Sequence, residues 1–296
     1  MFETPLPNAI GVAAILGKRT AQEDDCGFTV NRKRLLDEES KLFFVLCDGM
    51  GGHVGGRVAS STAVSAAVEE ATAVISQGNE NLLLGLEAAN RAIQRKIIEE
   101  PHLSDMGTTF LSILISKSGL VWCSVGDTAL FLYRGGEIQR LNEDHSVGPV
   151  LDELVAQNKI EAGHAAHDPN RSVLRSALTG GEIALIDDQP DPLILRRGDK
   201  ILMASDGLDT LSMQEVTEIL SLDGPAQELA SRLAENVLGM DKPRQDNTTV
   251  IVIDPSRLGW PLRIAGYRSA EKREGKMNSG SLLARILSFF EKPSKD

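Results

Sequence analysis

Residues 43–53, FFVLCDGMGGH, join an apolar run to an aspartate-glycine step, and the same arrangement returns in ILMASDG at 201–207. Both runs have the length and composition of a buried strand. A carboxylate at the end of a buried strand is costly unless something pairs with it. Asp48 and Asp206 are therefore predicted to bind a divalent cation. The competing interpretation is that both steps are ordinary strand-ending turns, since Asp and Gly are common there.

Two further acidic sites lie far away in the sequence. Glu23-Asp24-Asp25 is near the N-terminus, and Asp246-Asn247 directly precedes the apolar run at 248–253. These sites can act together only if the fold gathers them at one edge of a sheet. Oxygen ligands without a His or Cys set favour Mg²⁺ or Mn²⁺ over zinc. Two such ions sharing a carboxylate would activate a water for the hydrolysis of a phosphate ester.

Short motifs around these acidic residues follow one another in a recognisable order. They are RTAQED at 19–24, DGMGGH at 48–53, GTT at 107–109 with VGDT at 125–128, SDGL at 205–208, and DNTTV at 246–250. Together they resemble the motifs of the metal-dependent Ser/Thr protein phosphatases of the protein phosphatase 2C-like (PPM) family, and the chain looks like a bacterial member. The resemblance spans roughly residues 10 to 254.

The resemblance implies a set of ligands for two Mn²⁺ or Mg²⁺ ions and a weaker third. These ligands are Glu23, Asp24, Asp48, Gly49, Asp127, Asp206 and Asp246. Asp48 would bridge the two ions, and the Gly49 carbonyl would contact one of them. Asp206 and Asp246 would hold the first ion.

Glu23 would hold the second ion, and Asp127 would help to hold the third. Asp24 would bind a metal directly or support a residue that does. For Asp127 the alternative is a turn residue that caps a hairpin.

Arg19 would bind the substrate phosphate, because its planar guanidinium pairs bidentately with phosphate oxygens. The alternative for Arg19 is a surface salt bridge to Glu23. The chain departs from the family at Ser176, where the family carries an arginine that stands here one position earlier, as Arg175. No second phosphate-binding arginine is therefore expected at position 176.

Met50 stands where animal members carry a histidine that is thought to act as general acid. Water would then protonate the leaving group. His53 is not equivalent by position, and we expect it to hydrogen-bond or pack near the site.

Apolar runs rich in Val, Ile, Leu and Phe predict strands at 41–48, 108–116, 119–125, 128–134, 183–188, 199–205 and 248–253. Alanine-rich amphipathic stretches predict helices at 56–76 and 80–99. Two successive helices followed by a strand meander do not fit a doubly wound parallel sheet. They suit an α+β fold, the four-layer α/β/β/α sandwich of two antiparallel sheets flanked by helix pairs that the resemblance implies.

Residues 1–254 are predicted to form the catalytic domain, with a flap at about 142–171 that contains one helical piece at 150–157. Residues 255–296 carry a net charge of +5, against −16 for the rest of the chain, and this asymmetry marks an appendage. It is expected to form a basic linker and a short amphipathic helix. That helix would pack on the protein itself, or dock a partner or a membrane surface.

The net charge of −11 disfavours binding to a nucleic-acid backbone. Three cysteines without paired spacing suggest reduced thiols and a cytoplasmic protein. No apolar run approaches the roughly 20 residues of a membrane span, and no secretory signal is recognised.

These features predict a metal-dependent phosphatase acting on phosphoserine and phosphothreonine in proteins. By resemblance, the substrate would be a Ser/Thr kinase or a target of that kinase. Two alternatives stay open: a pseudophosphatase that binds phosphoproteins without turnover, and a hydrolase of small phosphate esters.

Overall fold

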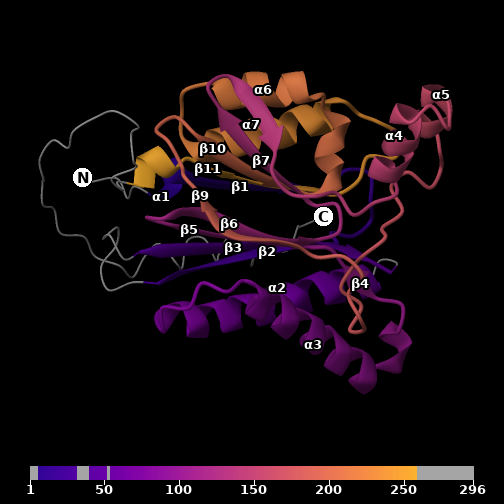
Figure 1. Cartoon of the computed structure of the whole chain (residues 1–296), viewed down its shortest axis with the longest axis horizontal. Coiled ribbons are helices and arrows are strands. Elements are labelled where there is room, and N and C mark those ends of the chain that lie inside the picture. The colour runs from indigo at the N-terminus through magenta and orange to yellow at the C-terminus, as the bar shows by residue number, and fades with distance from the viewer. Residues whose placement is uncertain (1–5, 32–39, 52–53, 259–296) are drawn as a thin grey trace, which may run out of the picture. The chain divides into compact units, whose positions relative to one another are not determined.

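Two antiparallel sheets form the inner layers of the fold, and a pair of helices covers the outer face of each (Figure 1). The computed structural model describes residues 6–31, 40–51 and 54–258. One sheet has the strand order β1-β11-β10-β7-β8, and the other has β2-β3-β5-β6-β9 with β4 paired to β3. The predicted four-layer α/β/β/α sandwich is confirmed.

The strands of the first sheet are β1 (Ile10–Ile15), β7 (Ala129–Arg134), β8 (Glu137–Arg140), β10 (Lys200–Ala204) and β11 (Thr248–Ile253). Those of the second are β2 (Asp24–Asn31), β3 (Lys41–Met50), β4 (Gly107–Thr108), β5 (Phe110–Ser116), β6 (Gly119–Val125) and β9 (Asp187–Leu193). The α-helices are α1 (Leu6–Ala9), α2 (Val54–Ser76), α3 (Leu83–Glu99), α4 (Gly148–Ala156), α5 (Ala162–Ala166), α6 (Met213–Ser221) and α7 (Ala226–Gly239). Short 3₁₀ turns are η1 (Pro101–Leu103), η2 (Asp206–Thr210) and η3 (Pro255–Leu258).

Strand β3 is apolar on both faces because both faces are covered. Phe43, Val45 and Cys47 pack in the cluster that α2 and α3 form on this sheet. Successive side chains of a strand point to opposite faces, so the buried Phe44 and Leu46 face the other sheet. The Asp-Gly step at the end of β3 is thereby held against a rigid core.

Helix α2 lies close to its sheet because alanines repeat along the buried face, at Ala59, Ala63, Ala67 and Ala71. On the opposite side of the fold, α6 and α7 cover the first sheet. The sequence prediction did not locate these two helices individually. Helix α6 begins at a capping box, in which Ser212 and Glu215 satisfy each other's backbone N–H groups.

The strand predicted at 183–188 is wrong in its bounds, because β9 begins at Asp187 and ends at Leu193. Its sequence, DDQPDPL, is polar and contains two prolines, which sheets tolerate at an edge. The region predicted as a flap contains two helices, α4 and α5, rather than one helical piece.

The chain stays packed beyond β11. Leu258 is buried, and Arg257 pairs with Asp254 at 2.9 Å and with Asp223 at 2.6 Å. The predicted linker and helix lie outside the described residues from position 259 onward. In the described part of the chain, no helix is both long enough and apolar enough to span a membrane.

Candidate metal centre

The acidic residues predicted from the sequence meet at one end of the two sheets. Asp48 ends the apolar part of β3, and Asp24 lies directly opposite it on β2. Asp206 follows β10, Asp246 precedes β11, and Asp127 lies in the turn between β6 and β7. Strand ends from both sheets therefore converge, as the metal hypothesis requires.

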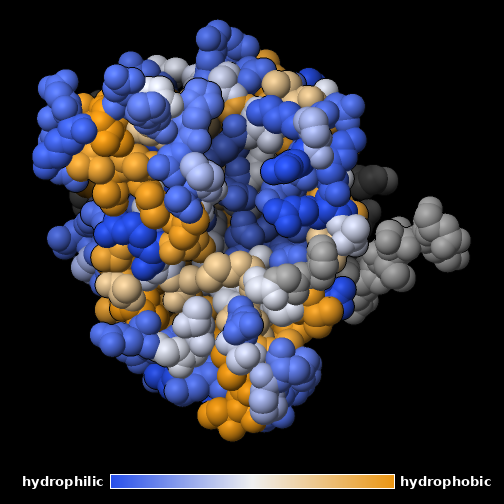
Figure 2. Space-filling model, turned by 90° about the vertical axis from the view of Figure 1, so that its right-hand side faces the viewer, coloured by the Kyte–Doolittle hydropathy of each residue, from blue (hydrophilic) through white to orange (hydrophobic). Residues whose placement is uncertain are grey.

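A cavity of about 810 Å³ opens at this end. Its lining includes all but one of the predicted site residues: Arg19, Glu23, Asp48, Gly49, Asp127, Asp206 and Asp246. Figure 2 shows this face of the molecule hollowed near its centre, with hydrophilic residues in the hollow and hydrophobic ones beside it. The exception is Asp24, which is buried and does not line the cavity.

Two threonines fix the backbone around Asp48. The Asp48 N–H donates to Thr109 Oγ1 at 2.8 Å, and the Asp48 carbonyl accepts from the Thr109 N–H at 2.9 Å and from Thr108 Oγ1 at 2.8 Å. Thr109 Oγ1 is also 2.6 Å from Thr128 Oγ1. The GTT and VGDT motifs thus hold the Asp48 backbone from the neighbouring strands.

Glu23 is placed by close backbone contacts. Its N–H donates to Asn247 Oδ1 at 2.9 Å, and its carbonyl accepts from the Gly49 N–H at 3.1 Å. A Cβ atom at Gly56 would lie 2.2 Å from Glu23 Oε2, so a larger residue would displace this carboxylate. Gly56 is therefore needed because of the close approach of Glu23.

Asp24 lies beneath the cavity. Its Oδ2 accepts a hydrogen bond of 2.8 Å from Ser205 Oγ, and Ser205 Oγ accepts one of 2.9 Å from the Thr249 N–H. Asp24 Oδ1 and Asp206 Oδ1 are buried without a hydrogen-bond partner among the described residues. Buried polar atoms normally have a hydrogen-bond partner, so these two carboxylate oxygens indicate that a further ligand binds here.

The carboxylates destabilise one another's charged forms. Burial, and then the charges of Asp127 and Asp246, raise the pKa of Asp206 to about 7. Burial above all raises the pKa of Asp24 and that of Asp127 to about 6. Burial and the neighbouring carboxylates raise the pKa of Asp48 well above its ordinary value. These groups are ionised together at neutral pH only if positive charge enters the cavity.

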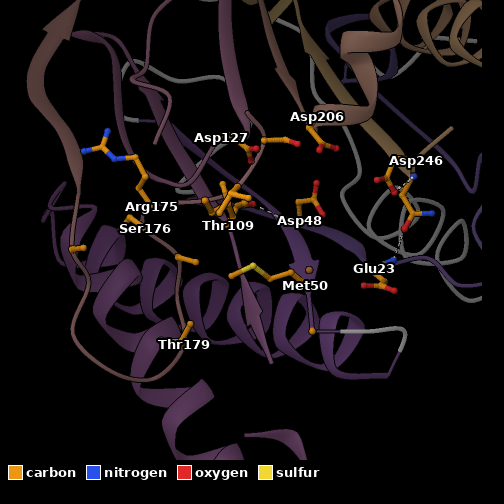
Figure 3. A pocket seen from close by; sticks show the side chains of 18 of the residues that line it. Glu23, Asp48, Met50, Thr109, Asp127, Arg175, Ser176, Thr179, Asp206 and Asp246 are labelled. Atoms are coloured by element: carbon orange, nitrogen blue, oxygen red, sulfur yellow. Dashed lines mark hydrogen bonds between the residues drawn. The ribbon is translucent and has the colours of Figure 1, made fainter. Parts of the chain in front are cut away.

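The donor set fits a hard divalent cation, because it consists of carboxylates and the Gly49 carbonyl. Asp48, Asp127 and Asp206 point into a common space (Figure 3). Yet no group of three or more acidic, His or Cys side chains among the described residues is tight enough to enclose an ion alone. Mg²⁺ keeps several waters when it binds through few carboxylates, so waters would complete the coordination here.

Arg19 pairs with Asp246, with 2.5 Å between Nη2 and Oδ2. The Arg19 side chain is half exposed at the cavity. The hydrogen bond that Arg19 donates to Asp246 is the main reason why the pKa of Arg19 is raised. The guanidinium thus lies beside the predicted metal ligands.

Sequence reasoning did not anticipate the opposite wall of the cavity. Residues 172–177 line it, together with Met50 and Thr179. Ser176 is buried, and its Oγ bonds both the carbonyl and the N–H of Leu185, at 2.8 and 3.0 Å. It therefore has a structural role, whereas the exposed Arg175 lines the cavity with its guanidinium directed away from the carboxylates (Figure 3). His53 lies outside the described residues.

Comparison with known proteins agrees with this geometry. Residues 16–242 match the family model for protein phosphatase 2C. The chain is 35% identical over 170 residues to the serine/threonine protein phosphatase PstP of Mycobacterium tuberculosis, which covers 55% of this chain and 30% of PstP. The chain thus spans about a third of the length of that relative.

Two crystal structures of PstP show the fold relationship. The M. tuberculosis PstP structure at 1.95 Å has a TM-score of 0.64, and a structure of the PstP catalytic domain in complex with two manganese ions has one of 0.60. Each is 30% identical and covers 83% of this chain and 98% of the other. The chain belongs to the protein phosphatase 2C family.

Proposed function

We propose that this protein is a metal-dependent protein phosphatase that hydrolyses phosphoserine and phosphothreonine. One observation carries the proposal: carboxylates from both sheets line a single cavity, and burial together with neighbouring carboxylates raises the pKa values of Asp206 and Asp127, an arrangement that a bound cation would offset. The family membership and the names of the relatives, which are serine/threonine phosphatases, support the same activity.

Two Mn²⁺ or Mg²⁺ ions are proposed to be held by the residues assigned from the sequence. Asp48 would be shared, Asp206 and Asp246 would hold one ion, and Glu23 with the Gly49 carbonyl would hold the other. The manganese ions in the PstP complex support this choice of metal. When bound, such ions would supply positive charge to the phosphoryl oxygens and activate a water.

Asp127 and Asp24 would have lesser roles. Asp127 adjoins Asp206 at the cavity and would help to hold a weaker third ion. Asp24 would act from below, because its hydrogen bond to Ser205 ties β2 to the residue that precedes Asp206. It would thus support the position of Asp206.

Arg19 would bind the substrate phosphate. Its partner Asp246 is itself a proposed metal ligand, so a cation at Asp246 would compete with the guanidinium for that carboxylate. The planar fork of Arg19 would then be free to take two phosphate oxygens. Arg19 would therefore pair with Asp246 when the site holds no metal, and with the substrate phosphate when a cation occupies Asp246.

A protein substrate suits the cavity better than a small ester alone. The carboxylates occupy one side, and the wall at 172–177 extends the cavity beyond the space that a phosphoryl group fills. We propose a phosphorylated Ser/Thr kinase or its target as substrate. The three cysteines are unpaired, with Cys47 and Cys123 buried, which supports a reducing cytoplasmic location.

A turnover assay on a phosphothreonine peptide, titrated with Mn²⁺, tests the proposal. We expect activity to rise with Mn²⁺ and to vanish with EDTA. Phosphopeptide binding without turnover at saturating metal would instead establish a pseudophosphatase. Turnover of p-nitrophenyl phosphate but not of phosphopeptides would establish a small-ester hydrolase.

A further inference from the structure

The wall of the cavity contains an open backbone edge at Leu174. Leu174 lines the large cavity, whereas Asp144, Ser146 and Gly148 line a second cavity of about 390 Å³. The segment at 172–176 therefore stands between the two, with the chain around Ser146 on the side of the smaller cavity.

Leu174 and Ser146 form an antiparallel bridge. The bonds that make it belong to their neighbours: the Val147 N–H donates to the Val173 carbonyl at 3.0 Å, and the Arg175 N–H donates to the His145 carbonyl at 2.8 Å. In this arrangement the N–H and the carbonyl of the bridged residue point away from the partner segment. The backbone N–H and carbonyl of Leu174 therefore face the larger cavity.

Within residues 6–31, 40–51 and 54–258, neither the N–H nor the carbonyl of Leu174 has a hydrogen-bond partner. An unpaired strand edge is a template for another extended chain. The Leu174 side chain is only half-buried, and Val173 and Arg175 are exposed. Nothing in the described residues covers this edge.

The edge is held at a fixed place relative to the carboxylates. The buried His145, whose carbonyl takes the Arg175 N–H, also donates its N–H to the Gly126 carbonyl at 3.1 Å. The Gly126 N–H in turn donates to His145 Nδ1 at 3.2 Å. Gly126 directly precedes Asp127, so the hydrogen bonds of His145 link the edge to the metal centre.

We propose that Leu174 pairs in antiparallel fashion with one residue of an extended phosphoprotein segment, next to the phosphorylated residue. The inference rests on the proposed phosphatase function, which places the phosphoryl group at the carboxylates of the same cavity. Addition of a strand to an open edge recognises the main chain and leaves side-chain sequence largely free. The occupant is therefore an extended segment, such as a loop or terminus, and not a helix.

An N-methyl scan of a phosphothreonine peptide tests the pairing with the wild-type enzyme. Each analogue carries one methylated amide among the residues that flank the phosphothreonine, and kcat/KM is measured at saturating Mn²⁺. We expect one analogue to lose roughly fivefold or more, about the size of one net hydrogen bond. The analogues methylated on either side of that position should stay close to the parent, because their N–H groups point away from Leu174.

Equal sensitivity at every position, or at none, would overturn the inference. Leu174→Pro removes the reciprocal donor, which is the enzyme's own N–H, so it should lower kcat/KM for the parent peptide by a larger factor than kcat/KM for p-nitrophenyl phosphate, which has no main chain. If the wild-type enzyme turns over p-nitrophenyl phosphate but shows no single sensitive position, only the strand pairing fails. If it turns over neither substrate with metal, the proposed function fails, and the inference fails with it.

Discussion

Replacing Asp206 with Asn should stabilise the metal-free protein, although it destroys the proposed site. The folded protein holds this carboxyl with a pKa of about 7, against an ordinary value of 3.8. A shift of that size corresponds to roughly 4 kcal/mol of unfavourable free energy once the group is fully ionised. The amide would also introduce buried N–H donors, and leaving one without a partner costs about 1 to 3 kcal/mol. We expect a net gain of about 1 to 3 kcal/mol at pH 8.

The same pKa sets the pH dependence of the wild-type protein in EDTA. Between about pH 4 and pH 7 the folded state keeps a proton that the unfolded state has released, so stability falls as the pH rises. The penalty is absent below the unfolded pKa and complete above the folded pKa. Urea unfolding of the EDTA-treated protein should therefore give greater stability at pH 6 than at pH 8, and Asp206→Asn should flatten this slope.

Asp199→Asn is the matched control. Asp199 is more deeply buried than Asp206, but its carboxylate accepts two hydrogen bonds from Arg134, at 2.9 and 2.7 Å, and one from the Arg196 N–H. The same chemical change should therefore destabilise the protein there, because it leaves the partly exposed Arg134 with a weaker partner. If Asp206→Asn also lowers the stability of the metal-free protein at pH 8, the uncompensated charge inferred at the site is refuted.

Three further changes test other parts of the site. Asp48→Ala should reduce metal-dependent turnover by several orders of magnitude with the fold intact by circular dichroism, and retention of more than about a tenth of the activity would contradict the shared-ligand role. Arg19→Ala should lower kcat/KM on phosphopeptides by a factor that corresponds to about 1.5 to 3 kcal/mol of transition-state free energy. The Mn²⁺ affinity measured by calorimetry should stay the same or rise, because Asp246 loses a competing partner. A marked drop in that affinity would mean that Arg19 organises the metal ligands. Truncation after Leu258 keeps the packed η3 turn, so turnover on a short phosphopeptide should stay near wild type; a lower melting temperature would show that the residues beyond belong to the core.

The metal ligands could be predicted because their chemistry conflicts with their surroundings. Asp48 and Asp206 follow apolar runs that could only be buried strands, and a carboxylate there needs a partner. Strand β2 was missed for the opposite reason. Its sequence, DDCGFTVN, begins with two acidic residues that hide the strand pattern, and only the register places Asp24 opposite Asp48.

The wall at 172–177 could not be predicted from local pattern. It depends on a pairing between segments around Ser146 and Leu174, on either side of helices α4 and α5. Neither segment has the length or the alternation of a strand. The hydrogen bonds between His145 and Gly126 likewise depend on tertiary contact, and no spacing in the sequence predicts them.

The contrast between Asp199 and the aspartates at the cavity explains why metal and fold should be coupled. Asp199 is neutralised by an arginine that the chain provides, so its burial is compatible with a stable domain without any ligand. At the cavity, the described residues offer Asp24, Asp48, Asp127 and Asp206 no comparable cation, and Arg19 engages Asp246 from a half-exposed position. The charge that balances these carboxylates must then come from solution. A ligand that binds only the folded state stabilises it in proportion to the logarithm of its concentration, so the ions proposed for catalysis would also stabilise the end of the sandwich at which β2, β3, β10 and β11 meet.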